Sequence, residues 1–195
     1  MNILYIDTTT ADLVVAIIQD NGIVDVSCRA MGVKHSETLC NKVAEALAKA
    51  GLSFADLNAY ACAVGPGSFT GIRIGVSTLK GYCTAVERPY IAVNCLQAIA
   101  VSPNCGQKGS AVIDAGNGYY YYDVQYGVSN CVISYGDERA ASAGRADGAC
   151  DYLDGAVKIV RDKFAGGSFD DSLSPVYIRK SQAEITLQNK VSQND

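Results

Sequence analysis

Runs of apolar residues along the chain predict a first set of strands and helices. Apolar runs bounded by turn residues predict five strands in the first hundred residues, at 2–8, 13–19, 23–30, 60–64 and 89–93. Apolar residues at helical spacing predict two helices, one at 36–50 with Ser36 as its cap and Gly51 at its end, and one at 70–86. The predicted order is βββαβαβ, and the first three strands are joined as hairpins.

A second set of elements follows a stretch rich in proline, asparagine and glycine at residues 101–110. Here the pattern predicts strands at 110–114, 119–126 and 131–135 and a helix at 149–164. In both halves the first strand ends in an aspartate, Asp7 or Asp114, and a turn and further strands come next. The sequence therefore indicates a duplicated unit, with a first lobe at 1–101 and a second at 102–195 that ends in a frayed polar tail.

Between the strand at 60–64 and the helix at 70–86 lies the glycine-rich stretch GPGSFTGIRIG, residues 65–75. Its glycines can take positive φ or admit another backbone, its proline fixes one φ angle, and Ser68 or Thr70 can cap the helix. A P-loop would need Lys followed by Ser or Thr after the last glycine, and the dinucleotide fingerprint needs a different glycine spacing. We therefore interpret the loop as structural, through Gly65, Pro66, Gly67, Ser68 and Gly71.

The helix at 70–86 has two distinct faces. Ile72, Val76 and Leu79 recur at the spacing of one apolar face, whereas Gly81 lies on a different side. Glycine inside a helix costs about 1 kcal/mol relative to alanine, so the repeated small residues indicate close packing. From the pattern alone, the second face can be buried within this chain or can meet another helix.

The composition of this chain of 195 residues is that of a globular protein, with 49% hydrophobic residues, 18% charged residues and a net charge of −4. Neither half is basic, which argues against a large surface for nucleic acid. Eight cysteines without a Cys-x-x-Cys pair indicate reduced core residues. No signal peptide or membrane-spanning segment is recognisable, so we expect a soluble cytoplasmic protein.

Four motifs in this order resemble the TsaB (YeaZ) family. They are Asp7-Thr8-Thr9, His35-Ser36-Glu37, the stretch GPGSFTGIRIG and, near the end, the segment PVYIR at 175–179. The resemblance implies an α/β fold of the two-lobed actin, Hsp70 and sugar-kinase type, which is ribonuclease H-like, with duplicated βββαβα units and a reduced second lobe. The second half departs from the family pattern, because Gly116 and Tyr119 stand where Arg and Glu are usual.

The resemblance also implies a role. TsaB proteins are non-catalytic scaffolds that bind a TsaD-like catalytic subunit, which transfers threonylcarbamoyl to the tRNA adenosine next to the anticodon. A TsaE-like ATPase is a further partner, a homodimer through the same helices is an alternative, and tRNA enters only in the complex. ATP and Mg²⁺ would be bound by partners, so this chain is expected to need no cofactor. The predicted interface residues, shared between core and contact, are Leu39, Val43, Leu47, Ile72, Gly75, Val76 and Leu79.

The alternative hypothesis is that the chain is a stand-alone ATP-dependent kinase or ATPase of the same fold. Its candidate nucleotide and Mg²⁺ residues are Asp7, Thr8, Thr9 and Asp114.

Metalloprotease chemistry needs two histidines on one helical turn, whereas His35 is the single histidine of the chain, and we expect it to be a helix-start residue. Cys62 and Cys83 are expected to be core residues, and tyrosines 119–122 to alternate across a strand, with a stacking role on RNA as the alternative.

Overall fold

The computed structural model describes residues 1–29, 32–103, 105, 111–116, 119–123, 132–135, 144–146 and 151–177; between 114 and 146 it describes the backbone alone. The predicted strands at 23–30, 110–114, 119–126 and 131–135 and the predicted helix at 149–164 extend in part beyond these ranges, and the tail from Gln188 lies entirely outside them.

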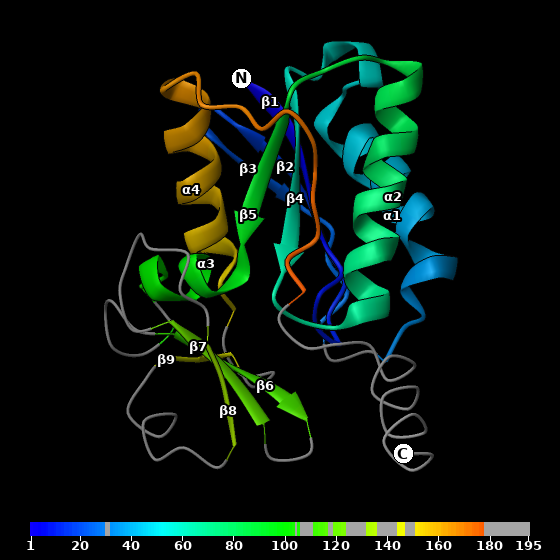
Figure 1. The fold of residues 1–195 in the computed structure, drawn as a ribbon. Coiled ribbons are helices and arrows are strands. Elements are labelled where there is room, and N and C mark those ends of the chain that lie inside the picture. Colours follow the sequence, from blue (N-terminus) through cyan, green and yellow to red (C-terminus); the bar gives the residue numbers. More distant parts are fainter. Residues whose placement is uncertain are drawn as a thin grey trace, which may run out of the picture.

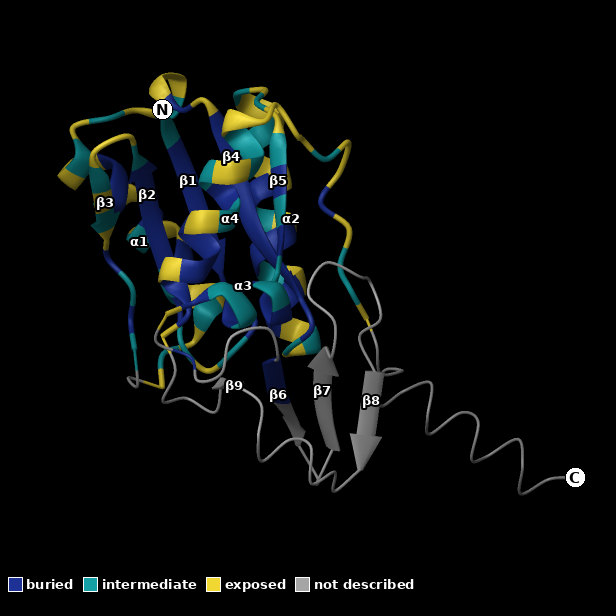
Figure 2. Cartoon of the chain, turned by 90° about the vertical axis from the view of Figure 1, so that its left-hand side faces the viewer, coloured by how far each residue is buried: buried dark blue, intermediate teal, exposed yellow. Residues whose placement is uncertain are grey.

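A five-stranded mixed sheet forms the centre of the molecule (Figure 1). Its strands are β1 (Asn2–Asp7), β2 (Val14–Gln19), β3 (Gly22–Asp25), β4 (Ala59–Gly65) and β5 (Tyr90–Asn94), in the order β3-β2-β1-β4-β5. The first three strands pair antiparallel, whereas β4 runs parallel to both β1 and β5. Every residue of β4 is buried, as its continuous apolar run predicted for a strand covered on both faces (Figure 2).

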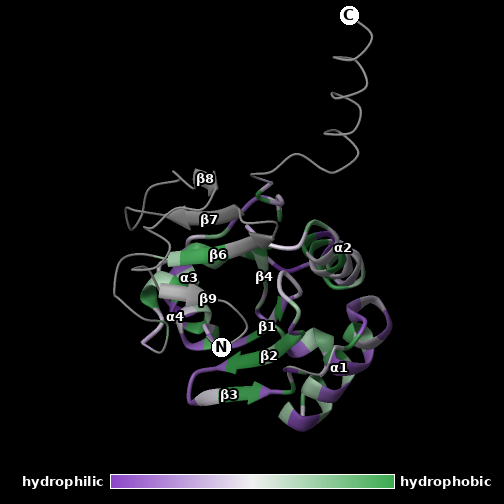
Figure 3. Cartoon of the chain, turned by 90° about the horizontal axis from the view of Figure 1, so that it is seen from below, coloured by the Kyte–Doolittle hydropathy of each residue, from purple (hydrophilic) through white to green (hydrophobic). Residues whose placement is uncertain are grey.

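Two layers of helices cover the two faces of this sheet (Figure 3). Because side chains alternate along β1, Leu4 and Ile6 pack in one core with α1 (His35–Ala50) and α2 (Phe69–Ala85). Ile3 and Tyr5 pack in the other core with α3 (Cys95–Val101) and α4 (Leu153–Ala165). A short 3-10 helix at Phe54–Asp56 precedes β4.

The second sheet repeats the strand order of the first. It contains β6 (Ala111–Gly116), β7 (Tyr119–Asp123), β8 (Val132–Tyr135) and β9 (Gly144–Ala146), in the order β8-β7-β6-β9. β6 pairs antiparallel with β7 and parallel with β9, as β1 does with β2 and β4. The predicted duplication is confirmed, and among the described residues the second sheet has no counterpart of β5.

Segments after the second sheet return to the first one. α4 packs in one core with β1, β5 and α3. Asp170 forms a bridge with Tyr90, and the Val176 amide donates a hydrogen bond to the Val64 carbonyl oxygen over 2.8 Å. The predicted boundary at 101/102 therefore separates the two sheets but not two independent cores. As a domain boundary it stays a prediction.

Three local predictions differ from the structure. The N-cap of α1 is Lys34, with no side-chain cap hydrogen bond, so Ser36 lies inside the helix and is not its cap. Residues 95–101 form α3, which the sequence did not predict, because seven residues directly after a strand are too few to display helical periodicity. Cys105 is disulfide-bonded, which corrects the expectation that every cysteine is reduced.

Candidate functional site

The glycine-rich loop joins β4 to α2 and packs against the turn that follows β1. Ser68 caps α2 as predicted, since its hydroxyl accepts a hydrogen bond from the Gly71 amide over 3.1 Å. The Ser68 amide donates to the Thr9 carbonyl oxygen over 2.7 Å, and the Thr8 hydroxyl donates to the Gly71 carbonyl oxygen over 2.6 Å. The loop and the turn therefore satisfy each other's backbone groups.

The loop glycines lie at positions where a side chain would be strained or would meet a neighbouring backbone. Gly65 has a φ of 105°, and the carbonyl oxygen of Val176 passes 3.0 Å from where its Cβ would stand. A Cβ on Gly67 would lie 2.6 Å from the Thr9 carbonyl oxygen, and one on Gly71 would overlap the Thr8 carbonyl oxygen. Pro66 is buried beside them. These residues allow α2 to pack closely against the turn after β1. Both sides of this contact belong to the same chain.

Asp7 lies at the end of β1, and its side chain is engaged by the protein itself. The residue is 1% exposed. One carboxylate oxygen accepts hydrogen bonds from the Thr9 amide at 2.8 Å and the Thr9 hydroxyl at 2.7 Å. The other accepts from the Tyr152 hydroxyl at 2.7 Å and the Tyr5 hydroxyl at 3.4 Å. A phosphate or Mg²⁺ at Asp7 would have to displace these donors.

The phenols around Asp7 are held neutral. Burial raises the pKa of Tyr152 well above its ordinary value, and the charge of Asp7 raises it further. Burial and Asp7 raise the pKa of Tyr5 in the same way. Both side chains therefore keep the proton that they donate to the carboxylate.

Cys62 and Cys95, the two cysteines near Asp7, are not nucleophiles. Burial raises the pKa of Cys62 and of Cys95, and Asp7 adds to the shift in both. Each thiol therefore stays protonated, and the prediction that Cys62 is a core residue is confirmed. Cys83 is partly buried and lies 3.4 Å from the Arg88 carbonyl oxygen.

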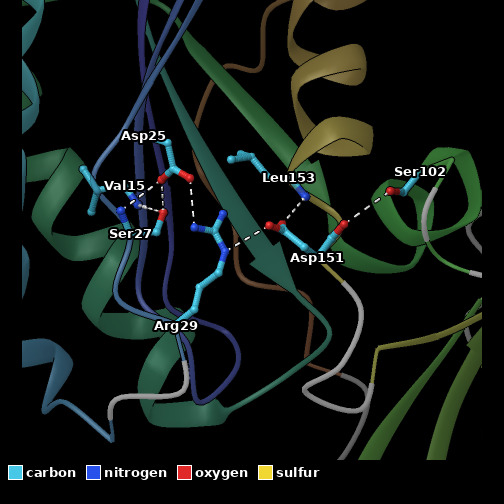
Figure 4. Close-up of polar contacts among 7 residues, drawn as sticks. All are labelled: Val15, Asp25, Ser27, Arg29, Ser102, Asp151 and Leu153. Carbon is cyan, nitrogen blue, oxygen red and sulfur yellow. Dashed lines mark hydrogen bonds and ion pairs between the residues drawn. The ribbon is translucent and has the colours of Figure 1, made fainter.

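Charged and polar contacts hold Asp151, the residue directly before Tyr152, at the start of α4 (Figure 4). Arg29 contacts Asp25 at 2.8 Å and Asp151 at 3.0 Å. Asp151 in turn accepts a hydrogen bond from the Leu153 amide over 3.0 Å, at the first turn of α4. Burial alone would raise the pKa of Asp25, but hydrogen bonds from Ser27 and Arg29 lower it overall.

Sequence reasoning missed the contact of Tyr152 with Asp7. The two residues are 145 positions apart, and no spacing pattern connects them. The side chain of Asp114, the fourth nucleotide candidate, lies outside the described side chains, so its relation to Asp7 is untested. His35 starts α1 and lies 3.3 Å from the Ala11 carbonyl oxygen. The described residues contain no group of three or more His, Cys, Asp or Glu side chains arranged for a metal ion.

All seven predicted interface residues are buried in the chain's own core. The most exposed of those with side chains, Leu47, is 6% exposed, and Gly75 is enclosed by Thr8 and Cys62. Their predicted share in a contact surface is therefore corrected, since apolar periodicity marks burial against this chain's own sheet. The exposed residues of α2 are Thr70, Arg73, Ser77, Lys80, Gly81, Thr84 and, at its last position, Ala85.

Comparison with known proteins agrees with the motifs. The family model described as TsaD, tRNA N6-adenosine threonylcarbamoyltransferase, matches residues 26–143. The tRNA threonylcarbamoyladenosine biosynthesis protein TsaB of Escherichia coli K12 is 35% identical over 144 residues, 72% of this chain and 62% of that protein. A tRNA N6-adenosine threonylcarbamoyltransferase of Novosphingobium aromaticivorans is 40% identical over 73 residues, 37% of this chain and 21% of that enzyme.

Solved structures give the fold. YeaZ from Pseudomonas aeruginosa superposes with a TM-score of 0.71 at 21% identity, and the match covers 91% of this chain and 99% of that one. Identity at this level shows the fold alone, and it confirms the predicted α/β class. None of the described helices combines the length and the apolar character that a bilayer crossing needs. On the family match and the Escherichia coli relative together, the chain belongs to the TsaD family and, within it, to the TsaB (YeaZ) group.

Proposed function

We propose that this chain is a non-catalytic scaffold subunit in the synthesis of threonylcarbamoyladenosine on tRNA. It binds a TsaD-like catalytic subunit, which transfers threonylcarbamoyl to the adenosine next to the anticodon. A TsaE-like ATPase and the tRNA join the assembled complex, and ATP and Mg²⁺ are held by those partners. The protein acts in the cytoplasm.

The observation that carries the proposal is the outer face of α2. Gly81 lies within this helix, is exposed, and would have nothing within 4 Å of an added Cβ. A mid-helix glycine costs about 1 kcal/mol relative to alanine, and no contact in the described part of the chain offsets that cost. A neighbouring helix that packs closely at this point would account for it, because small residues allow two helix backbones to approach.

The enclosure of Asp7 supports the non-catalytic part of the proposal. Its carboxylate receives four hydrogen bonds from the protein, which leaves no readily available oxygen for Mg²⁺. A stand-alone kinase of this fold would need that carboxylate open to the nucleotide. Calorimetry of the isolated chain with Mg-ATP distinguishes the two functions, because a scaffold would not bind Mg-ATP and a kinase would bind it.

The test is light scattering after size exclusion, with this chain alone and mixed with the TsaD-like protein of the same genome. We expect a mixed peak at the summed mass for the wild type and its loss for Gly81→Arg. Ala165→Arg, at the exposed end of α4 on the other face of the sheet, serves as the matched control and should assemble normally. A folded Gly81→Arg variant that still assembles would remove the outer face of α2 from the interface. Absence of a wild-type mixed peak would contradict the scaffold function.

A further inference from the structure

After α4 the chain passes from one side of the first sheet to the other (Figure 1). α4 packs in the core with α3, whereas Leu173, eight residues after Ala165 at the end of that helix, is fully buried in the core with α1 and α2. Residues 166–177, here named the crossover segment, pass the sheet at β5, where Asp170 bridges Tyr90. β5 is the last strand of the sheet on this side, so the crossover segment contacts an edge strand.

The peptide groups of β5 alternate between β4 and the edge of the sheet. The Tyr60 amide of β4 donates to the Pro89 carbonyl oxygen over 3.0 Å, so the carbonyl group just before β5 faces β4. Because the direction alternates from one residue to the next, the groups of Tyr90 and Ala92 face the edge. Unpaired edge groups are a template for pairing with another chain. The edge groups of β5 therefore need partners of their own.

Two charged residues provide these partners. The Asp170 amide donates to the Tyr90 carbonyl oxygen over 2.9 Å, and its carboxylate accepts a hydrogen bond from the Ala92 amide over 2.7 Å. The Lys163 ammonium donates to the Ala92 carbonyl oxygen over 3.0 Å and contacts the Asp170 carboxylate at 3.2 Å. One aspartate thus supplies a donor and an acceptor that a residue of a sixth strand would supply, and a lysine of α4 supplies a further donor.

The crossover segment is attached on both sides of Asp170. Phe169 packs edge-on against Phe164 of α4, with ring centroids 5.8 Å apart. On the other side, Leu173 is fully buried, and the Val176 amide donates to the Val64 carbonyl oxygen over 2.8 Å. Asp170 lies between these attachments, so the packing of its neighbours holds it at the edge.

β5 itself has none of the features that protect an edge strand. Its sequence, YIAVN, contains no charged residue and no proline, and tyrosine, isoleucine and valine favour strands. Charged side chains at an edge oppose pairing with another chain. Here the charges belong to Lys163 and Asp170, which lie outside the strand. The protection of this edge therefore comes from the segments next to β5.

We propose that the crossover segment covers the β5 edge and prevents a second copy of this chain from pairing there, with Asp170 in the position of a neighbouring strand. When the cover is removed, two copies pair through β5. A twofold axis would align the two strands antiparallel, so that the Tyr90 and Ala92 groups of each copy meet those of the other. This inference concerns the edge of the first sheet alone and does not depend on the proposed scaffold function.

The experiment uses the full chain and compares Asp170→Ala with Asp171→Ala, the matched control. Asp171 is the exposed neighbour of Asp170, and its side chain makes no hydrogen bond or ion pair within the described residues. Hydrogen exchange is measured at the Ala92 amide and at the amides of β1, at a protein concentration where the variant is monomeric. Sedimentation at rising concentration measures self-association, and circular dichroism verifies folding.

We expect Asp170→Ala to speed exchange of the Ala92 amide at least about tenfold and exchange in β1 less than about twofold. Its self-association should strengthen at least about tenfold over the wild type, whereas Asp171→Ala should stay within about twofold of the wild type. Asp170→Asn should fall between them, because it keeps an acceptor for the Ala92 amide and loses the charge that meets Lys163.

Ala92→Pro in the Asp170→Ala background locates the association. Proline has no amide to donate to a second strand, and edge strands tolerate it where the lost amide faces outward. The association gained in Asp170→Ala should therefore be lost in the double variant. Association that persists there would place the contact on another surface and overturn the inference.

Two further results would also overturn it. If Asp170→Ala speeds exchange equally at Ala92 and in β1, Asp170 stabilises the whole fold and has no separate role at the edge. If the Ala92 amide exchanges rapidly and the chain still does not associate, the uncovered edge is not a pairing site. Should Asp170→Ala not fold, Asp170→Asn decides between these outcomes with the same two measurements.

Discussion

The two faces of α2 use the same residue type for opposite reasons. On the inner face, Gly71 and Gly75 lack a Cβ because the turn after β1 occupies that space. On the outer face, Gly81 has nothing within 4 Å of the corresponding position. The inner glycines are explained by the fold of this chain, and the outer one is not. Small residues along a helix therefore indicate a partner only where their surroundings within the chain are empty.

The largest effect is expected at Gly71. An added Cβ would overlap the carbonyl oxygen of Thr8, a backbone atom at the end of a buried strand that cannot move aside easily. Gly71→Ala should lower the free energy of unfolding by about 3 kcal/mol, or prevent folding. Urea denaturation measures the loss, and Gly81→Ala on the same helix is the control. A loss below about 1 kcal/mol would mean that the turn yields more readily than its packing indicates.

Gly75→Ala should have a smaller effect of the same sign. Its Cβ would lie 2.7 Å from the Thr8 hydroxyl oxygen and 3.3 Å from the Cys62 sulfur, both of which are side-chain atoms that can shift. We expect a loss of about 2 kcal/mol. In a double-mutant cycle with Thr8→Ala, which removes the hydroxyl, the combined loss should be less than the sum of the single losses. Strictly additive losses would show that the crowding comes from another group.

The burial of the apolar residues of α2 explains why the sequence predicted the core of this chain well and its interface with a partner poorly. The spacing of Ile72, Val76 and Leu79 marks a buried face, and all three are buried. Periodicity cannot tell which surface covers an apolar face, so residues that meet the chain's own sheet were assigned in part to a partner. The environment of Gly75 depends on Thr8, 67 positions earlier.

Local chemistry was the most predictable part of the site. The Ser68 cap, the turn at Gly51 and the repeated order of strands follow from residue types and short-range patterns. The enclosure of Asp7 was not predictable, because Tyr152 arrives there through the packing of α4 on the first sheet. Arg29 and Asp151, which fix the start of α4, are likewise far apart in sequence.

The Tyr152 hydroxyl contacts Asp7, beside the turn that follows β1, from the side opposite to α2. Removing this hydroxyl tests how much the contact contributes to stability. Tyr152→Phe removes the hydroxyl that donates to Asp7 over 2.7 Å and leaves a buried carboxylate oxygen short of one donor. We expect a loss of about 1.5 kcal/mol in the free energy of unfolding. Tyr60→Phe is the matched control, because the Tyr60 hydroxyl donates to a neutral carbonyl oxygen at Val86 over 3.1 Å and should contribute less. Equal losses in the two variants would show that the charge of Asp7 adds nothing.

The smallest effect, and the one of opposite sign, is expected at Gly81. Alanine has the higher helix propensity, and its methyl group enters open space, so Gly81→Ala should raise the free energy of unfolding by up to about 1 kcal/mol. A residue that destabilises its own helix without a contact to offset the cost is explained if a partner needs the space. Gly81→Ala should therefore combine a more stable isolated chain with weaker binding of the catalytic subunit, measured by urea denaturation and calorimetry on the same preparation. If the variant is more stable and binds equally well, Gly81 lies outside the contact, and the difference between the two faces of α2 concerns folding alone.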